Sequence, residues 1–174
     1  MRMLVSPSRR NRESSAVRYV DIEVTGTGNS INPLAYLDQL ADLAPQLPPG
    51  ARAFAVDPDH YDFHGERCVK DLKIEQLRFG ADDDGATFEI HFRHNCWKHE
   101  EDLRITYRRL SGFTLDNDPD DKWGDQIVIL DEVLPHEHGC SHEIACHTGT
   151  LTIVCGDLDA VWVPAECPEQ EQEQ

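Results

Sequence analysis

The segment TFEIHFRHNCWKHEEDLRITYR, residues 87–108, decides the fold class. Apolar and polar residues alternate through 87–93 and again through 103–108, and a polar stretch separates the two runs. A period of two is typical of strands that bury one face, and two such runs around a turn predict an antiparallel hairpin. The side chains expected on its buried face are Phe88, Ile90, Phe92, Leu103, Ile105 and Tyr107.

The same alternation recurs along most of the chain, with turn-forming Asp, Asn, Pro and Gly residues between the runs. A second hairpin is expected where Thr148 and Gly149 join 141–147 to 150–155, and residues 157–163 are expected to continue this meander. The candidate strands are 20–24, 52–56, 69–79, 86–94, 102–109, 126–134, 141–147, 150–156 and 158–163.

One amphipathic helix is expected near the N-terminus. Asn32 suits the N-cap, Pro33 suits the first helical position, and apolar residues repeat at helical spacing from Leu34 to Ala44. The Pro-Pro-Gly sequence at 48–50 is expected to end it. Together these patterns predict an α+β fold, mainly antiparallel β, built as a sandwich or open barrel with the helix packed on the sheet.

The 174 residues fit one domain, which we expect to span 19–165. Residues 1–18 are rich in Arg and Ser and predict a disordered or loosely attached arm, and 166–174 predict a disordered acidic tail. The sequence has no apolar run of the length that a signal peptide or a membrane span requires. We therefore expect a cytoplasmic protein whose six cysteines are free thiols and which does not associate with membranes.

The charge is strongly acidic and unevenly distributed. The formal net charge is −17, and no Lys or Arg follows Lys122. Such a surface repels phosphate backbones, so nucleic-acid binding is not expected, whereas it favours association with a basic protein. Aromatic and acidic side chains are the groups expected to contact this partner, namely Trp97, Trp123, Asp125, Glu132 and Glu137.

Two His- and Cys-rich segments suggest zinc as a possible cofactor. Zinc in proteins takes four Cys or His ligands in a tetrahedron, and two short ligand groups brought together by a fold can supply them. The candidate ligands are His94, Cys96, His99, His136, His138, Cys140 and His142. A third cluster at 57–64 mixes aspartates with His60 and His64, and turn formation is the commoner reason for its Asp-Pro-Asp sequence.

Motifs that identify an enzyme are not found. No Ser or Cys stands in a recognised nucleophile elbow, and the sequence contains no phosphate-binding glycine loop. No catalytic residue is therefore assigned. The sequence favours a non-enzymatic acidic protein-binding module, inhibitor- or immunity-like toward a basic protein; the alternative is a zinc-binding protein, structural or hydrolytic, that uses the clusters at 94–99 and 136–147.

Overall fold

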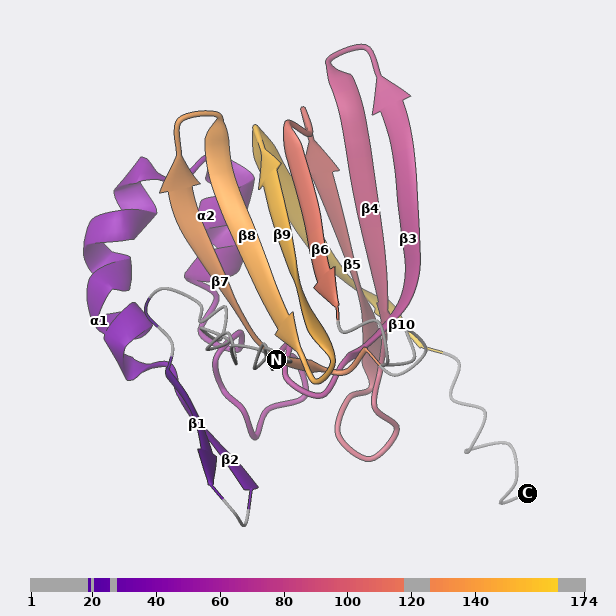
Figure 1. The fold of residues 1–174 in the computed structure, drawn as a ribbon. Helices are drawn as coiled ribbons and strands as arrows, with labels where there is room; N and C mark the ends of the chain where they lie inside the picture. Colours follow the sequence, from indigo (N-terminus) through magenta and orange to yellow (C-terminus); the bar gives the residue numbers. More distant parts are fainter. Residues whose placement is uncertain (1–18, 20, 26–27, 118–125, 166–174) are drawn as a thin grey trace, which may run out of the picture.

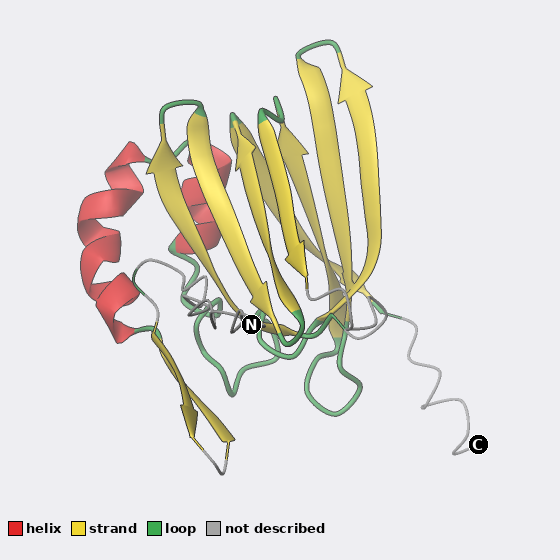
Figure 2. Ribbon diagram, in the orientation of Figure 1, coloured by secondary structure: helices red, strands yellow, loops and turns green. Residues whose placement is uncertain are grey.

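Two antiparallel sheets of four strands each form the body of the protein (Figure 1). The computed structural model describes residues 19, 21–25, 28–117 and 126–165. One sheet has the strand order β10-β5-β4-β3 and the other β6-β9-β8-β7, and a separate two-stranded hairpin pairs β1 with β2. The sandwich predicted from the alternation is thus the observed fold, with strands predominating over helices (Figure 2).

The bounds of the elements follow the chain in order. They are β1 (Asp21–Thr25), β2 (Gly28–Asn32), α1 (Leu34–Leu43), the 3-10 turn η1 (Ala44–Gln46), α2 (Pro49–Ala55), β3 (Lys73–Asp82), β4 (Gly85–Arg93), β5 (Glu101–Arg108), β6 (Gly112–Asn117), β7 (Val128–His136), β8 (Gly139–Cys146), β9 (Gly149–Cys155) and β10 (Asp157–Pro164).

The hairpin that decides the fold class forms as predicted from β4 and β5. Phe88 pairs with Tyr107, and Ile90 pairs with Ile105. All six side chains predicted for the buried face are at most 2% exposed and belong to the main core between the two sheets. The second predicted hairpin is β8 and β9, in which Ala145 pairs with Thr150.

Strand β7 is buried on both faces. Its inner face lies in the main core, while Ile129 and Leu130 on the outer side pack in a second cluster with Tyr36 of α1. The Tyr36 hydroxyl donates to the Val133 carbonyl oxygen at 2.8 Å, which fixes the helix on this edge strand. The predicted helix therefore packs on the sheet, and it leaves β7 without a solvated face.

Two predictions were wrong, and one strand was not predicted. Residues 52–56 form most of helix α2 rather than a strand, because Asp157 caps the helix by accepting hydrogen bonds from the backbone of Gly50 and Ala51. Strand β10 leaves the meander after β9 and pairs with β5 of the other sheet. Strand β6 was not predicted; it pairs with β9.

The connections divide between the two ends of the sandwich (Figure 1). The 94–100 loop between β4 and β5 lies at one end, which we call the loop end. The β3–β4 and β7–β8 turns lie at the opposite end (Figure 1). Among the described residues, no helix is long and apolar enough to cross a membrane.

Candidate functional site

A chain of hydrogen bonds crosses the interior of the sandwich. His60 Nε2 lies 2.8 Å and 3.0 Å from the two carboxylate oxygens of Asp131, and His142 Nε2 lies 2.8 Å from one of them. The other ring nitrogen of His142 lies 2.8 Å from the Tyr107 hydroxyl. These four side chains are at most 2% exposed, so the chain connects the 56–72 segment, β7, β8 and β5 inside the core.

The hydrogen-bond partners determine which of these groups carry charge. His60 Nδ1 lies 2.9 Å from the Phe54 carbonyl oxygen, which can only accept, so both ring nitrogens of His60 donate and the ring is an imidazolium. Burial opposes this charge, but the Asp131 carboxylate outweighs it and raises the pKa of His60 above its ordinary value. His142 Nε2 donates to Asp131, and its Nδ1 is bonded to the Tyr107 hydroxyl, which can either donate or accept.

Asp131 is the carboxylate that balances the buried imidazolium. Burial by itself would raise its pKa, but the charge of His60 and the hydrogen bonds from His142 and His60 hold the pKa well below the usual range. The rings of Phe54 and Tyr61 lie on His60 with centroids 4.1 Å and 4.2 Å away, where aromatic faces attract a cation. Because solvent does not reach these groups, we interpret the network as structural.

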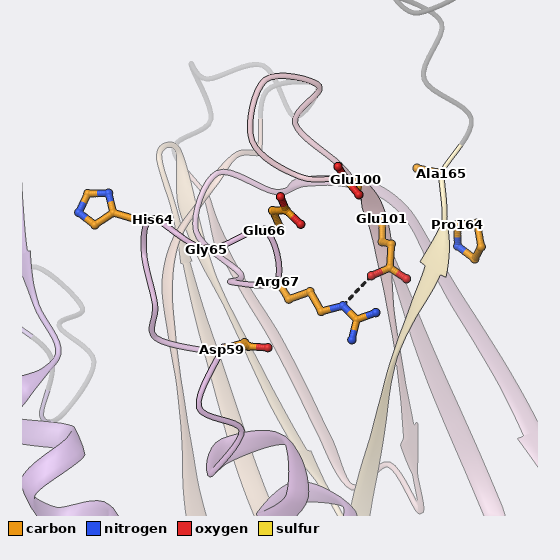
Figure 3. A pocket seen from close by; sticks show the side chains of 9 residues that line it. All are labelled: Asp59, His64, Gly65, Glu66, Arg67, Glu100, Glu101, Pro164 and Ala165. Atoms are coloured by element: carbon orange, nitrogen blue, oxygen red, sulfur yellow. Dashed lines mark hydrogen bonds and ion pairs between the residues drawn. The ribbon is translucent and has the colours of Figure 1, made fainter.

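A groove at the loop end is an accessible concave feature of the described residues (Figure 3). It has a volume of about 830 Å³ and is formed by the 59–67 segment, the start of β5 and the end of β10. Its charged lining is four carboxylates, Asp59, Glu66, Glu100 and Glu101, against the single guanidinium of Arg67.

The ion pairs of the groove leave most of its negative charge uncompensated. Arg67 Nε donates to Glu101 at 2.6 Å, as the dashed line in Figure 3 shows. Among the described residues, no ion pair involves Asp59, Glu66 or Glu100, and all three are exposed. The groove therefore presents an acidic surface to any ligand that enters it.

A second concavity of about 550 Å³ shares His64 and Glu66 with the groove and extends it toward Trp97. Trp97 is 77% exposed. The two cations on this side, Lys70 and Lys98, both pair with Asp71, at 2.7 Å and 3.0 Å respectively. The two concavities together form one surface, which we call the acidic groove, with an aromatic side chain on its rim.

The candidate zinc ligands do not assemble. The 94–99 loop lies at the loop end and the β7–β8 turn, which carries His136 and His138, lies at the opposite end (Figure 1). His142 belongs to the buried network, and Cys140 faces Cys155 with their sulfur atoms 3.6 Å apart. Within the described ranges, no group of three or more His, Cys, Asp or Glu residues is arranged to hold a metal ion.

The 94–99 loop instead forms its own hydrogen-bonded cluster. Cys96 Sγ lies 3.4 Å from His94 Nε2, and His94 Nδ1 lies 2.7 Å from Asp102 Oδ1. His99 is turned away from this pair, since its Nε2 donates to the Cys68 carbonyl oxygen at 3.0 Å and its Nδ1 accepts from the backbone of Asn95 at 3.1 Å. The loop therefore unites two of its three predicted ligands, together with a carboxylate that the sequence reasoning did not select.

The residues predicted to contact a partner are dispersed. Trp97 stands on the acidic groove, whereas Glu137 is exposed on the β7–β8 turn at the other end. Glu132, also predicted to contact a partner, is only 2% exposed and accepts a hydrogen bond from the Tyr19 backbone at 2.9 Å. Trp123 and Asp125 lie outside the described residues.

The sequence analysis did not predict the acidic groove, because its carboxylates come from two separate segments, 59–67 and 100–101, whose patterns indicate turns. The chain was compared with protein family models, curated proteins and solved structures, and none of them matches it.

Proposed function

We propose that this protein is a non-enzymatic binding module whose acidic groove binds a Lys- and Arg-rich segment of another protein. The observation that carries the proposal is the position of Trp97, 77% exposed, on a concavity that shares Glu66 with the groove lined by Asp59 and Glu100. Tryptophan is the residue type most enriched among those that dominate binding energy, and its exposure to water is costly unless a partner covers it.

Charge complementarity favours a basic partner. The exposed carboxylates Asp59, Glu66 and Glu100 all line the groove, so a cationic side chain that enters it is attracted by groups of opposite charge. The net charge of −17 adds a long-range field of the same sign, which accelerates encounter with a cation at low ionic strength. Phe63 and Trp97 supply the apolar contact that orients the bound segment.

Fluorescence anisotropy with a labelled peptide of Lys-Leu-Arg repeats tests the proposal, and an equivalent Glu-Leu-Glu peptide serves as the negative probe. We expect saturable binding of the basic peptide at about 50 mM salt and much weaker binding at about 300 mM, where the Debye length falls to less than half. Because exposed ion pairs contribute about 0.2–1 kcal/mol each, a Glu66→Gln/Glu100→Gln variant should bind roughly 2- to 30-fold more weakly.

A matched control separates the groove from the overall charge. Asp83 and Asp84 are exposed on the β3–β4 turn at the opposite end, so Asp83→Asn/Asp84→Asn removes the same charge far from the groove. We expect this control to bind within about 2-fold of the parent protein, and Trp97→Ala to lose roughly 30-fold or more. Equal losses in the two double variants, or no binding of the basic peptide at low salt, would contradict the proposal.

A further inference from the structure

The cluster of Cys96, His94 and Asp102 has the connectivity of an activated thiol. Asp102 Oδ1 accepts from both the backbone nitrogen of His94, at 2.8 Å, and its ring Nδ1, at 2.7 Å. The Cys96 sulfur lies 3.4 Å from the opposite ring nitrogen, Nε2. A thiol, an imidazole and a carboxylate thus stand in line, with each in hydrogen-bond contact with the next.

The carboxylate determines the tautomer of the ring. An ionised carboxylate can only accept, so Nδ1 of His94 carries a proton and, in the neutral ring, Nε2 presents its lone pair to the Cys96 sulfur. Burial would raise the pKa of Asp102, but the backbone and ring hydrogen bonds from His94 outweigh it and hold the pKa below its ordinary value, so the group stays ionised near neutrality. His94 is placed to accept the thiol proton and to become an imidazolium that Asp102 stabilises.

We propose that Cys96 is a nucleophilic thiol that reacts with low-molecular-mass disulfides. This assignment goes beyond the proposed binding function and does not depend on it. Cys96 is partly exposed, whereas the other four cysteines within the described residues, Cys68, Cys140, Cys146 and Cys155, are at most 7% exposed. Geometry and access therefore select the same thiol.

The proposed reaction is a thiol–disulfide exchange. The Cys96 proton passes to His94 Nε2, and the resulting thiolate attacks one sulfur of the disulfide. A new bond forms between Cys96 Sγ and that sulfur, while the original S–S bond breaks and its electron pair leaves with the second sulfur. The departing thiolate takes the proton from the His94 imidazolium. Cys96 is oxidised to a mixed disulfide and the departing sulfur is reduced, so no further oxidant is needed.

The surrounding charges set the pH range of this reaction. On β4, His91 contacts the other oxygen of Asp102 at 3.2 Å and also Glu75 of β3 at 3.2 Å. Lys98, on the same loop, is held by Asp71 at 3.0 Å. Asp102 is the carboxylate bonded to the His94 ring, so protonation of Asp102 at low pH should abolish the activation.

The test reacts the full chain, carrying Cys167→Ser, with an aromatic disulfide. The rate is measured from the absorbance of the aromatic thiolate that the reaction releases. The Cys167→Ser substitution removes the cysteine that lies outside the described residues, and peptide mass spectrometry locates the modified sulfur. Between about pH 8 and pH 6 the reaction of an unperturbed thiol slows by roughly 75-fold, because its thiolate fraction falls. We expect the reaction of Cys96 to slow by less than about 10-fold over this range.

Two variants show whether the imidazole and the carboxylate act on the thiol. Asp102→Asn retains an acceptor for Nδ1 but removes the charge that stabilises the imidazolium. The rate at about pH 6 should therefore fall at least roughly 10-fold, and the pH dependence of the rate should shift toward that of glutathione, which serves as the unperturbed thiol. Asp159→Asn, at an exposed ion pair with Arg108, should leave both the rate and the profile unchanged.

If Asp102→Asn does not fold, the pH dependence of the reaction rate in the parent protein tests the proposal by itself. A 75-fold decline matching that of glutathione, or modification at a cysteine other than Cys96, would overturn it. An unchanged profile in a folded Asp102→Asn variant would also overturn it, because the carboxylate would then have no effect on the thiol.

Discussion

Replacement of Asp131 by Asn tests the charge assignment of the buried network. Asn has nearly the same shape as Asp, so the change removes a charge and one acceptor without creating a cavity. Asp131 accepts hydrogen bonds from His60 at 2.8 Å and 3.0 Å and from His142 at 2.8 Å. In the variant, the amide oxygen can accept from one imidazole, while the amide nitrogen faces the N–H of the other.

The expected loss of stability follows from these contacts. One hydrogen bond that involves a charged group is lost, which costs about 1.5–3 kcal/mol, and His60 must either remain charged without a counter-ion or lose its proton. Removing one partner of a buried ion pair typically costs about 3–5 kcal/mol, and we expect a value in this range. For a chain of this size the corresponding decrease in Tm is roughly 6–20 °C.

Urea denaturation followed by tryptophan fluorescence measures this change, with Asp159→Asn as the matched control. Asp159 makes an ion pair with Arg108 in which both side chains are more than 40% exposed, so the same substitution there should cost less than about 1 kcal/mol. If Asp131→Asn lowers the free energy of unfolding by no more than Asp159→Asn does, the interior holds no ion pair and the assignment of an imidazolium to His60 is wrong.

Three further outcomes follow from the same contacts. Folding raises the pKa of His60, so its contribution to stability should be complete below about pH 6.5 and should be lost as pH rises above this value. Folding lowers the pKa of Asp131, so its contribution should be complete above about pH 4 and should be lost as pH falls below this value. Denaturation curves measured between about pH 3 and pH 9 should therefore show the largest difference in free energy of unfolding between the parent and Asp131→Asn at about pH 4 to 6.5. A difference that does not change with pH would contradict this expectation. Tyr107→Phe should cost about 1–3 kcal/mol in the same urea assay, because the buried His142 Nδ1 loses its hydrogen-bond partner. A loss of less than about 0.5 kcal/mol would mean that another group replaces the hydroxyl. Gly50→Ala should lower Tm clearly despite the better helix propensity of Ala, since an added Cβ would lie 2.0 Å from the Leu158 carbonyl oxygen, and an unchanged or raised Tm would show that α2 does not approach β10 this closely.

The sequence predicts those parts of the fold whose signal is local. The β4–β5 hairpin follows from the alternation of six apolar side chains, and the register that buries them is the observed one. Helix α2 could not be predicted in this way, because the carboxylate that caps its first turn belongs to Asp157, more than 100 residues away. The transfer of β10 to the other sheet is equally non-local, since alternation indicates which face of a strand is buried but not which strand is its neighbour.

The buried network had a sequence signal that was not used. Residues 128–134 carry apolar side chains at both odd and even positions around Asp131 and Glu132, and a strand that is apolar on both faces has no solvated side for a carboxylate. Such a carboxylate requires buried donors, and the chain has nine histidines to supply them. Which histidines do so depends on the packing of the two sheets and of the 56–72 segment, so His60 and His142 could not be identified in advance.

The buried ion pair also helps to position the wall of the acidic groove. Segment 56–72 contains no strand or helix and carries the exposed side chains Asp59 and Glu66, so its position depends on contacts with the core. His60 supplies such a contact one residue after Asp59, and the hydroxyl of Tyr61 adds a hydrogen bond to the Asp131 backbone at 2.9 Å. The segment is thus held from inside the protein, and among the described residues no ion pair involves Asp59 or Glu66 at its surface.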